Sequence, residues 1–177
     1  MGVEPPQSVV EAHGVGRFEV GYRVILDGRD VGTVDRVGSR ARWKVTVDGV
    51  DGLVGRGEDG QLALRLDGKL HLKARTLRAA GVLGVGSAIE RVGRGGVEAK
   101  LMFLGGRQSA DERVRLRPEP TGRLSVRRLV GDGPVAPDLA VFACVLHEVR
   151  QAHADQARVV GIFGGFGLFD FGLGLLG

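Results

Sequence analysis

Short runs of alternating apolar and polar residues fill most of the chain, and glycine-containing turns separate them. In the run 42–47 every second residue is apolar, namely Trp43, Val45 and Val47, and the residues between them are polar. A period of two is typical of a β-strand with one buried and one exposed face. Asp-Gly pairs, which favour the tight turns of hairpins, recur between the runs. We therefore expect a mainly β, antiparallel structure.

Nine runs are long enough to be strands, and we expect nine or ten strands in all. Their ranges are 18–26, 31–37, 42–47, 62–65, 69–75, 88–92, 97–104, 113–117 and 123–130. Pro118 and Pro120 should mark a loop, because proline cannot donate a hydrogen bond to the ladder of a central strand. This number of strands is enough to close a barrel or to build a strongly curved sheet.

The hairpin around Asp67-Gly68 can be predicted to the level of its register. Four leucines must share the buried face if both strands are to contribute to a core: Leu62, Leu64, Leu70 and Leu72. A three-residue loop over 66–68 pairs Leu64 with Leu70, whereas a two-residue loop would place Leu64 opposite His71. We therefore predict the three-residue loop. The same register places five basic side chains together on the outer face: Arg65, Lys69, His71, Lys73 and Arg75.

The longest apolar segment follows the strands. It runs without interruption from Leu139 to Leu146, after Pro137 and Asp138. Asp138 is well placed for the positive N-terminal end of a helix. A helix that is apolar on every side must be enclosed, and this one is too short for the roughly twenty residues that cross a bilayer. We therefore expect a helix over 137–155 that the strands enclose.

The two ends of the chain lack the alternating pattern. We expect a flexible arm over 1–16, a barrel domain over 17–157 and a separate tail over 158–177 that is rich in glycine and phenylalanine. The arm has neither the basic start nor the apolar run of a signal peptide, which predicts a cytoplasmic protein, peripheral to the membrane where it binds one. The tail offers four phenylalanines for membrane contact or self-association: Phe163, Phe166, Phe169 and Phe171.

The charge of the chain favours anionic partners. The formal net charge is +4 and the sequence pI is near 9.8. Phospholipid head groups and nucleic acids both fit such a balance. Single-stranded nucleic acid also requires aromatic side chains on which bases stack, and few aromatic residues precede the tail. Anionic phospholipid, or a membrane surface that contains it, is therefore the partner we expect, and nucleic acid fits less well.

The sequence contains no complete motif for catalysis, metal binding or a cofactor. His147-Glu148 begins like the helix motif of zinc proteases, but Gln151 stands where the second histidine ligand is required. The glycine cluster over 81–86 lacks the third glycine of a dinucleotide-binding loop, because Ile89 occupies its place. Cys144 lies among apolar neighbours, which keeps a thiol protonated and inert. We therefore expect no enzyme, no metal and no cofactor.

Three features together resemble one superfamily. They are the turn Asp27-Gly28-Arg29-Asp30-Val31-Gly32, the final strand over 124–129 and the hydrophobic helix entered through Pro137. The layout is similar to that of tubby-like C-terminal domains, phospholipid scramblases and LURP-one-related proteins. This resemblance implies a closed twelve-stranded barrel threaded by the helix, with phosphoinositide binding or membrane association. No phosphoinositide-site residue can be matched to this chain, and the scramblase calcium segment has no counterpart.

Residues 20–37 also resemble the opening of a PRC-barrel, a small module that docks on protein partners, although that module leaves the second half of the chain unexplained. The sequence therefore supports two hypotheses. The first is a non-enzymatic antiparallel barrel, or strongly curved sheet, around one C-terminal hydrophobic helix, which binds anionic lipid or a membrane surface. The alternative is a protein- or RNA-binding β module. The sequence sets no oligomeric state.

Overall fold

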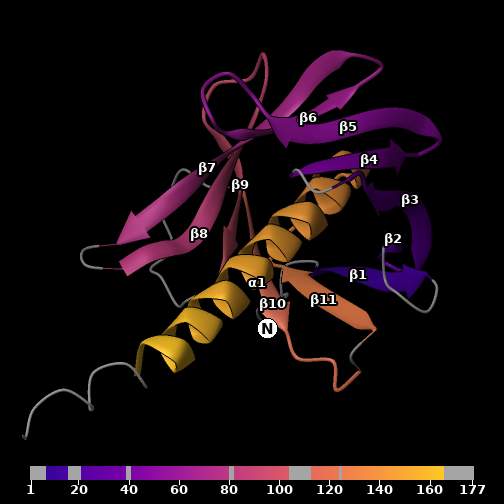
Figure 1. Ribbon diagram of the computed structural model, residues 1–177. Coiled ribbons are helices and arrows are strands. Elements are labelled where there is room, and N and C mark those ends of the chain that lie inside the picture. The colour runs from indigo at the N-terminus through magenta and orange to yellow at the C-terminus, as the bar shows by residue number, and fades with distance from the viewer. Residues whose placement is uncertain are drawn as a thin grey trace, which may run out of the picture. The chain divides into compact units, whose positions relative to one another are not determined.

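The computed structural model describes residues 7–15, 21–38, 41–79, 82–103, 113–123 and 125–165. Within these ranges eleven strands form one closed barrel and a single helix follows them (Figure 1). The elements are β1 Ser8–Val15, β2 Gly21–Leu26, β3 Arg29–Arg36, β4 Arg42–Val47, β5 Val50–Arg56, β6 Leu62–Leu66, β7 Lys69–Ala79, β8 Val82–Arg91, β9 Val97–Met102, β10 Val114–Glu119, β11 Val126–Gly131 and α1 Pro137–Gly165. The mainly β barrel with one C-terminal helix is thus confirmed.

Each strand pairs with its neighbours along the chain, and β1 closes the barrel by pairing with both β2 and β11. All the pairs are antiparallel except β9 with β10, which is parallel. Tight Asp-Gly turns join several of the hairpins. At Asp67 and Gly68, for example, φ is 47° and 73°, which is the left-handed geometry of a two-residue hairpin turn.

The predicted flexible arm over 1–16 is wrong for residues 8–15, which form β1. Val10 and Ala12 are buried and alternate with Glu11 and His13, so the strand has the expected period of two. The pattern is short and contains small residues, which makes it weak in the sequence. Residues 1–6 and 16 lie outside the described part of the chain.

The register predicted for the β6–β7 hairpin is also wrong. The loop has two residues, Asp67 and Gly68, and Leu66 pairs with Lys69. The ladder then shifts by one residue between Leu64 and Arg65, so Leu64 pairs with Leu72. This bulge brings Leu72 to the buried face opposite Leu64, because one extra residue restores the alternation beyond the turn. Leu70, predicted to share that face, instead pairs with Arg65 and is only partly buried.

Two further differences concern strands. The strand β5 was not expected, because Gly52 and Gly55 interrupt its apolar residues. Pro118 lies within β10, where it pairs with Leu129 of β11, although Pro120 does follow the strand as expected. Proline is tolerated there because the ladder between β10 and β9 ends at Leu116, so Pro118 has no donor to supply on that side.

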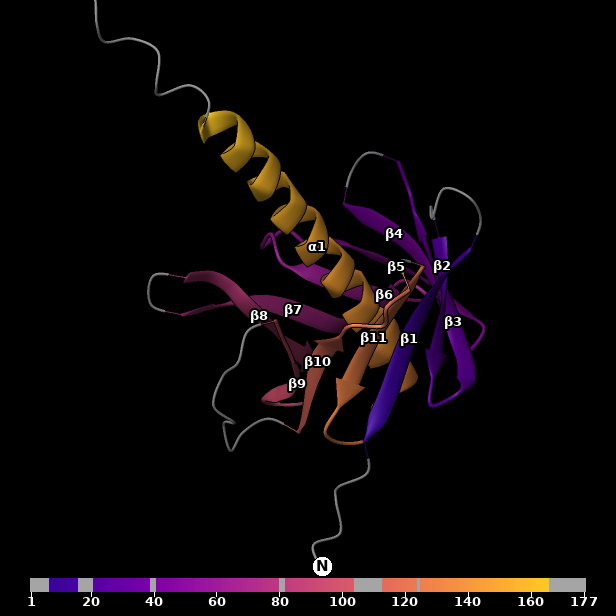
Figure 2. The ribbon, with the colours of Figure 1, turned by 90° about the horizontal axis from the view of Figure 1, so that it is seen from below.

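The first part of α1 lies in the core of the barrel. All side chains from Leu139 to His147 are at most 7% exposed, including Cys144. Figure 2 shows strands around the first turns of this helix. Val141 comes close to the β3–β4 ladder at Gly32, where an added Cβ would overlap the carbonyl oxygen of Thr46. The buried helix is therefore confirmed, and glycine at position 32 allows the sheet to approach it.

The helix does not end at residue 155 as predicted but continues to Gly165. A glycine inside a helix costs about 1 kcal/mol relative to alanine but keeps its backbone hydrogen bonds, so the glycines after residue 160 weaken the helix without ending it. Phe163 falls on this extension, and Phe166, Phe169 and Phe171 lie outside the described residues. The chain divides into two compact units, 1–147 and 148–177, instead of at the predicted boundary after 157.

Over its described length α1 lacks the sustained apolar stretch that a membrane-crossing helix requires. Charged side chains fix the N-terminus of α1 to the barrel. Asp138 accepts a hydrogen bond from the backbone N–H of Leu139 and also two from Arg91 at the end of β8. Arg91 in turn lies 3.4 Å from Glu98 of β9. The three side chains are only 13–18% exposed, so they form a nearly buried ion-pair triad.

Candidate anion-binding groove

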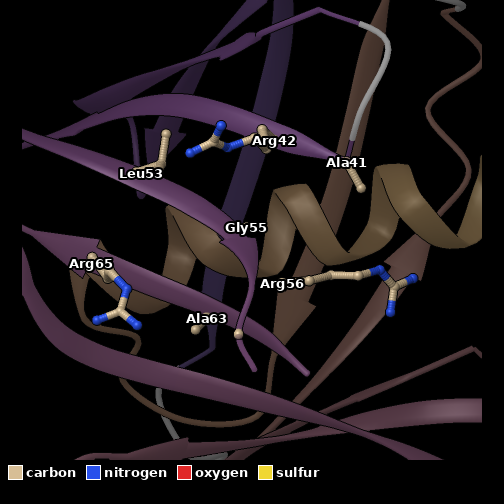
Figure 3. Close-up of a pocket in the computed structure, with 8 residues that line it drawn as sticks. Ala41, Arg42, Leu53, Gly55, Arg56, Ala63 and Arg65 are labelled. Carbon is tan, nitrogen blue, oxygen red and sulfur yellow. The ribbon is translucent and has the colours of Figure 1, made fainter. Parts of the chain in front are cut away.

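A groove of about 500 Å³ lies on the outer face of β4, β5 and β6 (Figure 3). Arg42, Gly55 and Ala63 are cross-strand neighbours there, because Arg42 pairs with Gly55 and Gly55 pairs with Ala63. Glycine has no side chain and alanine only a methyl group, so the middle of this row is hollow. Leu53 completes the floor, and three arginines form the rim: Arg42, Arg56 and Arg65.

Gly55 is the residue that keeps the groove open. A Cβ added there would meet only the Cγ of Arg42, at 3.9 Å. The backbone at Gly55 also has none of the positive φ that would require glycine. Space above the sheet, and not backbone strain, therefore distinguishes this position, and a larger side chain would enter the groove without displacing the strand.

The rim carries positive charge that no carboxylate of the described part of the chain neutralises. Arg42 and Arg65 are exposed, and no carboxylate of the described residues lies within ion-pair distance of either. Arg56 donates a hydrogen bond from Nη1 to the carbonyl oxygen of Gly60 at 2.9 Å, which is an uncharged partner. Figure 3 shows Arg42 and Arg65 on either side of Leu53, with Arg56 beyond Gly55. Guanidinium groups in such a setting suit phosphate or carboxylate, which they can bind through two parallel hydrogen bonds.

The predicted basic face is divided by this arrangement. Arg65 lines the groove, whereas Lys69 is exposed beside the β6–β7 turn and His71 is the extra residue of the bulge. Lys73 Nζ lies 3.3 Å from Asp59 Oδ2. Arg75 lies 3.8 Å from Glu90, and both side chains are about half exposed. The structure thus places all five on or beside one hairpin but gives two of them carboxylate partners.

Asp59 remains ionised beside Lys73. The N–H of Gln61 donates a hydrogen bond to its carboxylate, which is the largest cause of a lowered pKa, and Lys73 lowers the pKa further. Lys73 is therefore partly neutralised at neutral pH. Among the described residues the three arginines of the groove have no such partner, and the five residues predicted from the sequence included only one of them, Arg65.

Arg42 and Arg56 were missed as site residues for a geometric reason. The alternation in 42–47 does place Arg42 on the outer face, as its exposure confirms. Its position near Arg65 depends on the intervening strand β5, which the sequence did not predict. Two outward arginines separated by a glycine-containing segment could have suggested the groove, but only if the register of β4, β5 and β6 had been known.

The remaining reactive side chains of the described residues do not form a second centre. No group of three or more histidine, cysteine or acidic side chains in that part of the chain is arranged to hold a metal ion. His147 is buried, its ring stacks on Phe103 with the centroids 6.1 Å apart, and its pKa is lowered to about 4. Burial is the main cause and the nearby charge of Arg127 adds to it. His147 is thus neutral at physiological pH.

Searches against protein-family models, curated proteins and solved structures give no match to this chain. A closed barrel with a C-terminal helix is consistent with the tubby-like, scramblase and LURP-one-related organisation, but it does not identify the chain as a member.

Proposed function

We propose that this barrel is a non-enzymatic module that binds anionic lipid head groups at a membrane surface, and that the groove is its contact site. One observation carries the proposal: three arginines, Arg42, Arg56 and Arg65, surround an uncharged hollow, and among the described residues none of them has a carboxylate partner. Leaving arginines unpaired around a concave surface gains little for folding, whereas an incoming phosphate would neutralise them.

The chemistry of the groove favours lipid over nucleic acid. None of the described residues that line it is aromatic, so it offers no platform on which a base could stack. A lipid head group needs only charge and hydrogen-bond donors, and guanidinium groups supply both. A basic residue near an anionic membrane contributes about 1 kcal/mol, so the rim supplies about 3 kcal/mol. The apolar tail over 158–177 would be a second attachment, as stable membrane association generally requires two.

The experiment measures cosedimentation of the full chain with vesicles of phosphatidylcholine containing phosphatidylserine. Replacing Arg42 and Arg65 together by alanine removes about 2 kcal/mol and should weaken binding about 30-fold. The control is the pair Lys69→Ala and Arg94→Ala, which removes the same charge from exposed sites outside the groove. Equal losses in both pairs would show diffuse attraction and contradict a groove. Tighter binding to single-stranded RNA than to these vesicles would favour the alternative function.

A further inference from the structure

The positive charge of the groove is confined by acidic residues around it. Lys44, the next outward residue of β4, stands opposite Asp35 of β3. Thr46, the outward residue beyond it, stands opposite Asp51 of β5. On the far side, two of the basic side chains of β7, Lys73 and Arg75, have carboxylate partners. The arginines of the groove are therefore flanked by acidic residues of β3 and β5 and by paired basic side chains of β7.

The floor of the groove differs from its rim in being uncharged and apolar. Leu53 is partly exposed there, and Ala63 is 5% exposed. Between them Gly55 leaves open space above the backbone. A flat basic surface would attract a head group without making apolar contacts to its carbon atoms. In this groove the apolar floor can also contact the carbon atoms of a ligand whose anionic group the arginines bind.

We propose, resting on the function above, that the groove holds a single anionic amphiphile: its phosphate lies between Arg42 and Arg65, and the carbon atoms beside the phosphate contact Leu53, Gly55 and Ala63. About 500 Å³ is within the range of pockets that hold small ligands. The site is then a stoichiometric one, which captures a dissolved lipid monomer as well as a head group in a bilayer. Each methylene buried on the floor should strengthen binding about fourfold.

The experiment titrates the full chain by calorimetry with three probes. They are dihexanoyl phosphatidylglycerol below its micellar concentration, glycerol 3-phosphate, which has the anion without acyl chains, and dihexanoyl phosphatidylcholine, which has the chains without net charge. We expect the first to bind with one molecule per chain and at least tenfold more tightly than either of the others. Equal affinity for glycerol 3-phosphate would overturn the role of the floor, and equal affinity for the choline lipid would overturn the role of the arginines.

The variant Gly55→Leu separates this inference from the proposed function. It fills the groove, keeps all three arginines and occupies open space on an outward strand position, so the barrel should fold. Binding of the monomeric lipid should fall at least tenfold, while vesicle binding stays within about threefold because the arginines remain. Unchanged monomer binding by a folded Gly55→Leu variant would refute the single-lipid site and leave the vesicle experiment to decide the broader function. Fluorescence of Trp43, the single tryptophan, which is 2% exposed, verifies the fold.

Discussion

Replacing Arg91 by methionine should destabilise the barrel strongly, because the guanidinium is the shared partner of two carboxylates. Its Nη1 lies 2.5 Å from Asp138 and its Nε 3.4 Å from Glu98. The hydrogen bond with Asp138 is the largest cause of the raised pKa of Arg91, so the guanidinium is charged at neutral pH. Methionine preserves the aliphatic stem of the side chain but leaves both carboxylates without their cation.

The size of the effect follows from the burial of the triad. Removing one partner of a fully buried ion pair costs about 3–5 kcal/mol, since the other charge is left uncompensated. These side chains keep 13–18% exposure, so water compensates in part and we expect about 2–4 kcal/mol. For a domain of this size the corresponding fall in Tm is roughly 4–16 °C. The variant Asp138→Asn combined with Arg91→Met should recover part of the loss, because it removes one of the stranded charges.

Urea unfolding monitored by the fluorescence of Trp43 measures the change in the free energy of unfolding. The matched control is Arg75→Met. Arg75 of β7 pairs with Glu90 of the neighbouring strand β8, at 3.8 Å, with exposures of 57% and 47%, and such surface pairs contribute about 1 kcal/mol or less. If Arg91→Met and Arg75→Met lower the free energy of unfolding by the same small amount, the triad does not fix the N-terminus of the helix to the barrel.

Three further predictions concern other parts of the chain. Gly32→Ala should cost more than about 2 kcal/mol in urea unfolding, because its Cβ would overlap the carbonyl of Thr46, whereas Gly55→Ala should be nearly neutral; equal effects would contradict the close approach. His147 has a folded pKa of about 4, below the ordinary value of 6.5, so the unfolded state binds more protons between these values. The contribution of His147 to the free energy of unfolding should therefore be fully present above pH 6.5 and fall by about 3 kcal/mol as the pH drops to 4. The variant His147→Gln should lack this pH dependence, and an unchanged pH profile in the variant would show that other groups cause it. Deleting residues 158–177 should weaken vesicle cosedimentation while the urea midpoint of the barrel stays the same, and undiminished cosedimentation would count against the tail as an attachment.

The sequence predicts those features of the fold that depend on one segment at a time. The alternation in 42–47 correctly assigns Trp43, Val45 and Val47 to the inside, and the unbroken apolar run correctly identifies a buried helix. In both, the pattern of a short window determines which side chains need to leave water. The helix end at Gly165 was missed because glycine lowers helix stability by a small amount per residue, which does not fix a boundary.

The features that were missed depend on pairing between strands. The bulge between Leu64 and Arg65 allows the hairpin to have a two-residue Asp-Gly turn and still bury both Leu64 and Leu72. A regular ladder with the same turn would place Leu64 opposite His71. The groove likewise exists only because Arg42, Gly55 and Ala63 come into one row across three strands. Cross-strand neighbours are far apart in sequence, and a one-residue change of register would exchange every neighbour.

The pairing of β1 with β11 has a consequence for how the protein is made. Ser8 pairs with Gly131, so β1 leaves the ribosome roughly 120 residues before β11, its second partner in the barrel. Contacts between such distant residues form slowly. The apolar turns of α1 are synthesised later still, and they are buried inside the barrel that the β1–β11 pairing closes. Pairing of β1 with β11 and burial of the core therefore occur together and late. A nascent chain that ends before residue 147 would lack part of the helix around which the barrel closes.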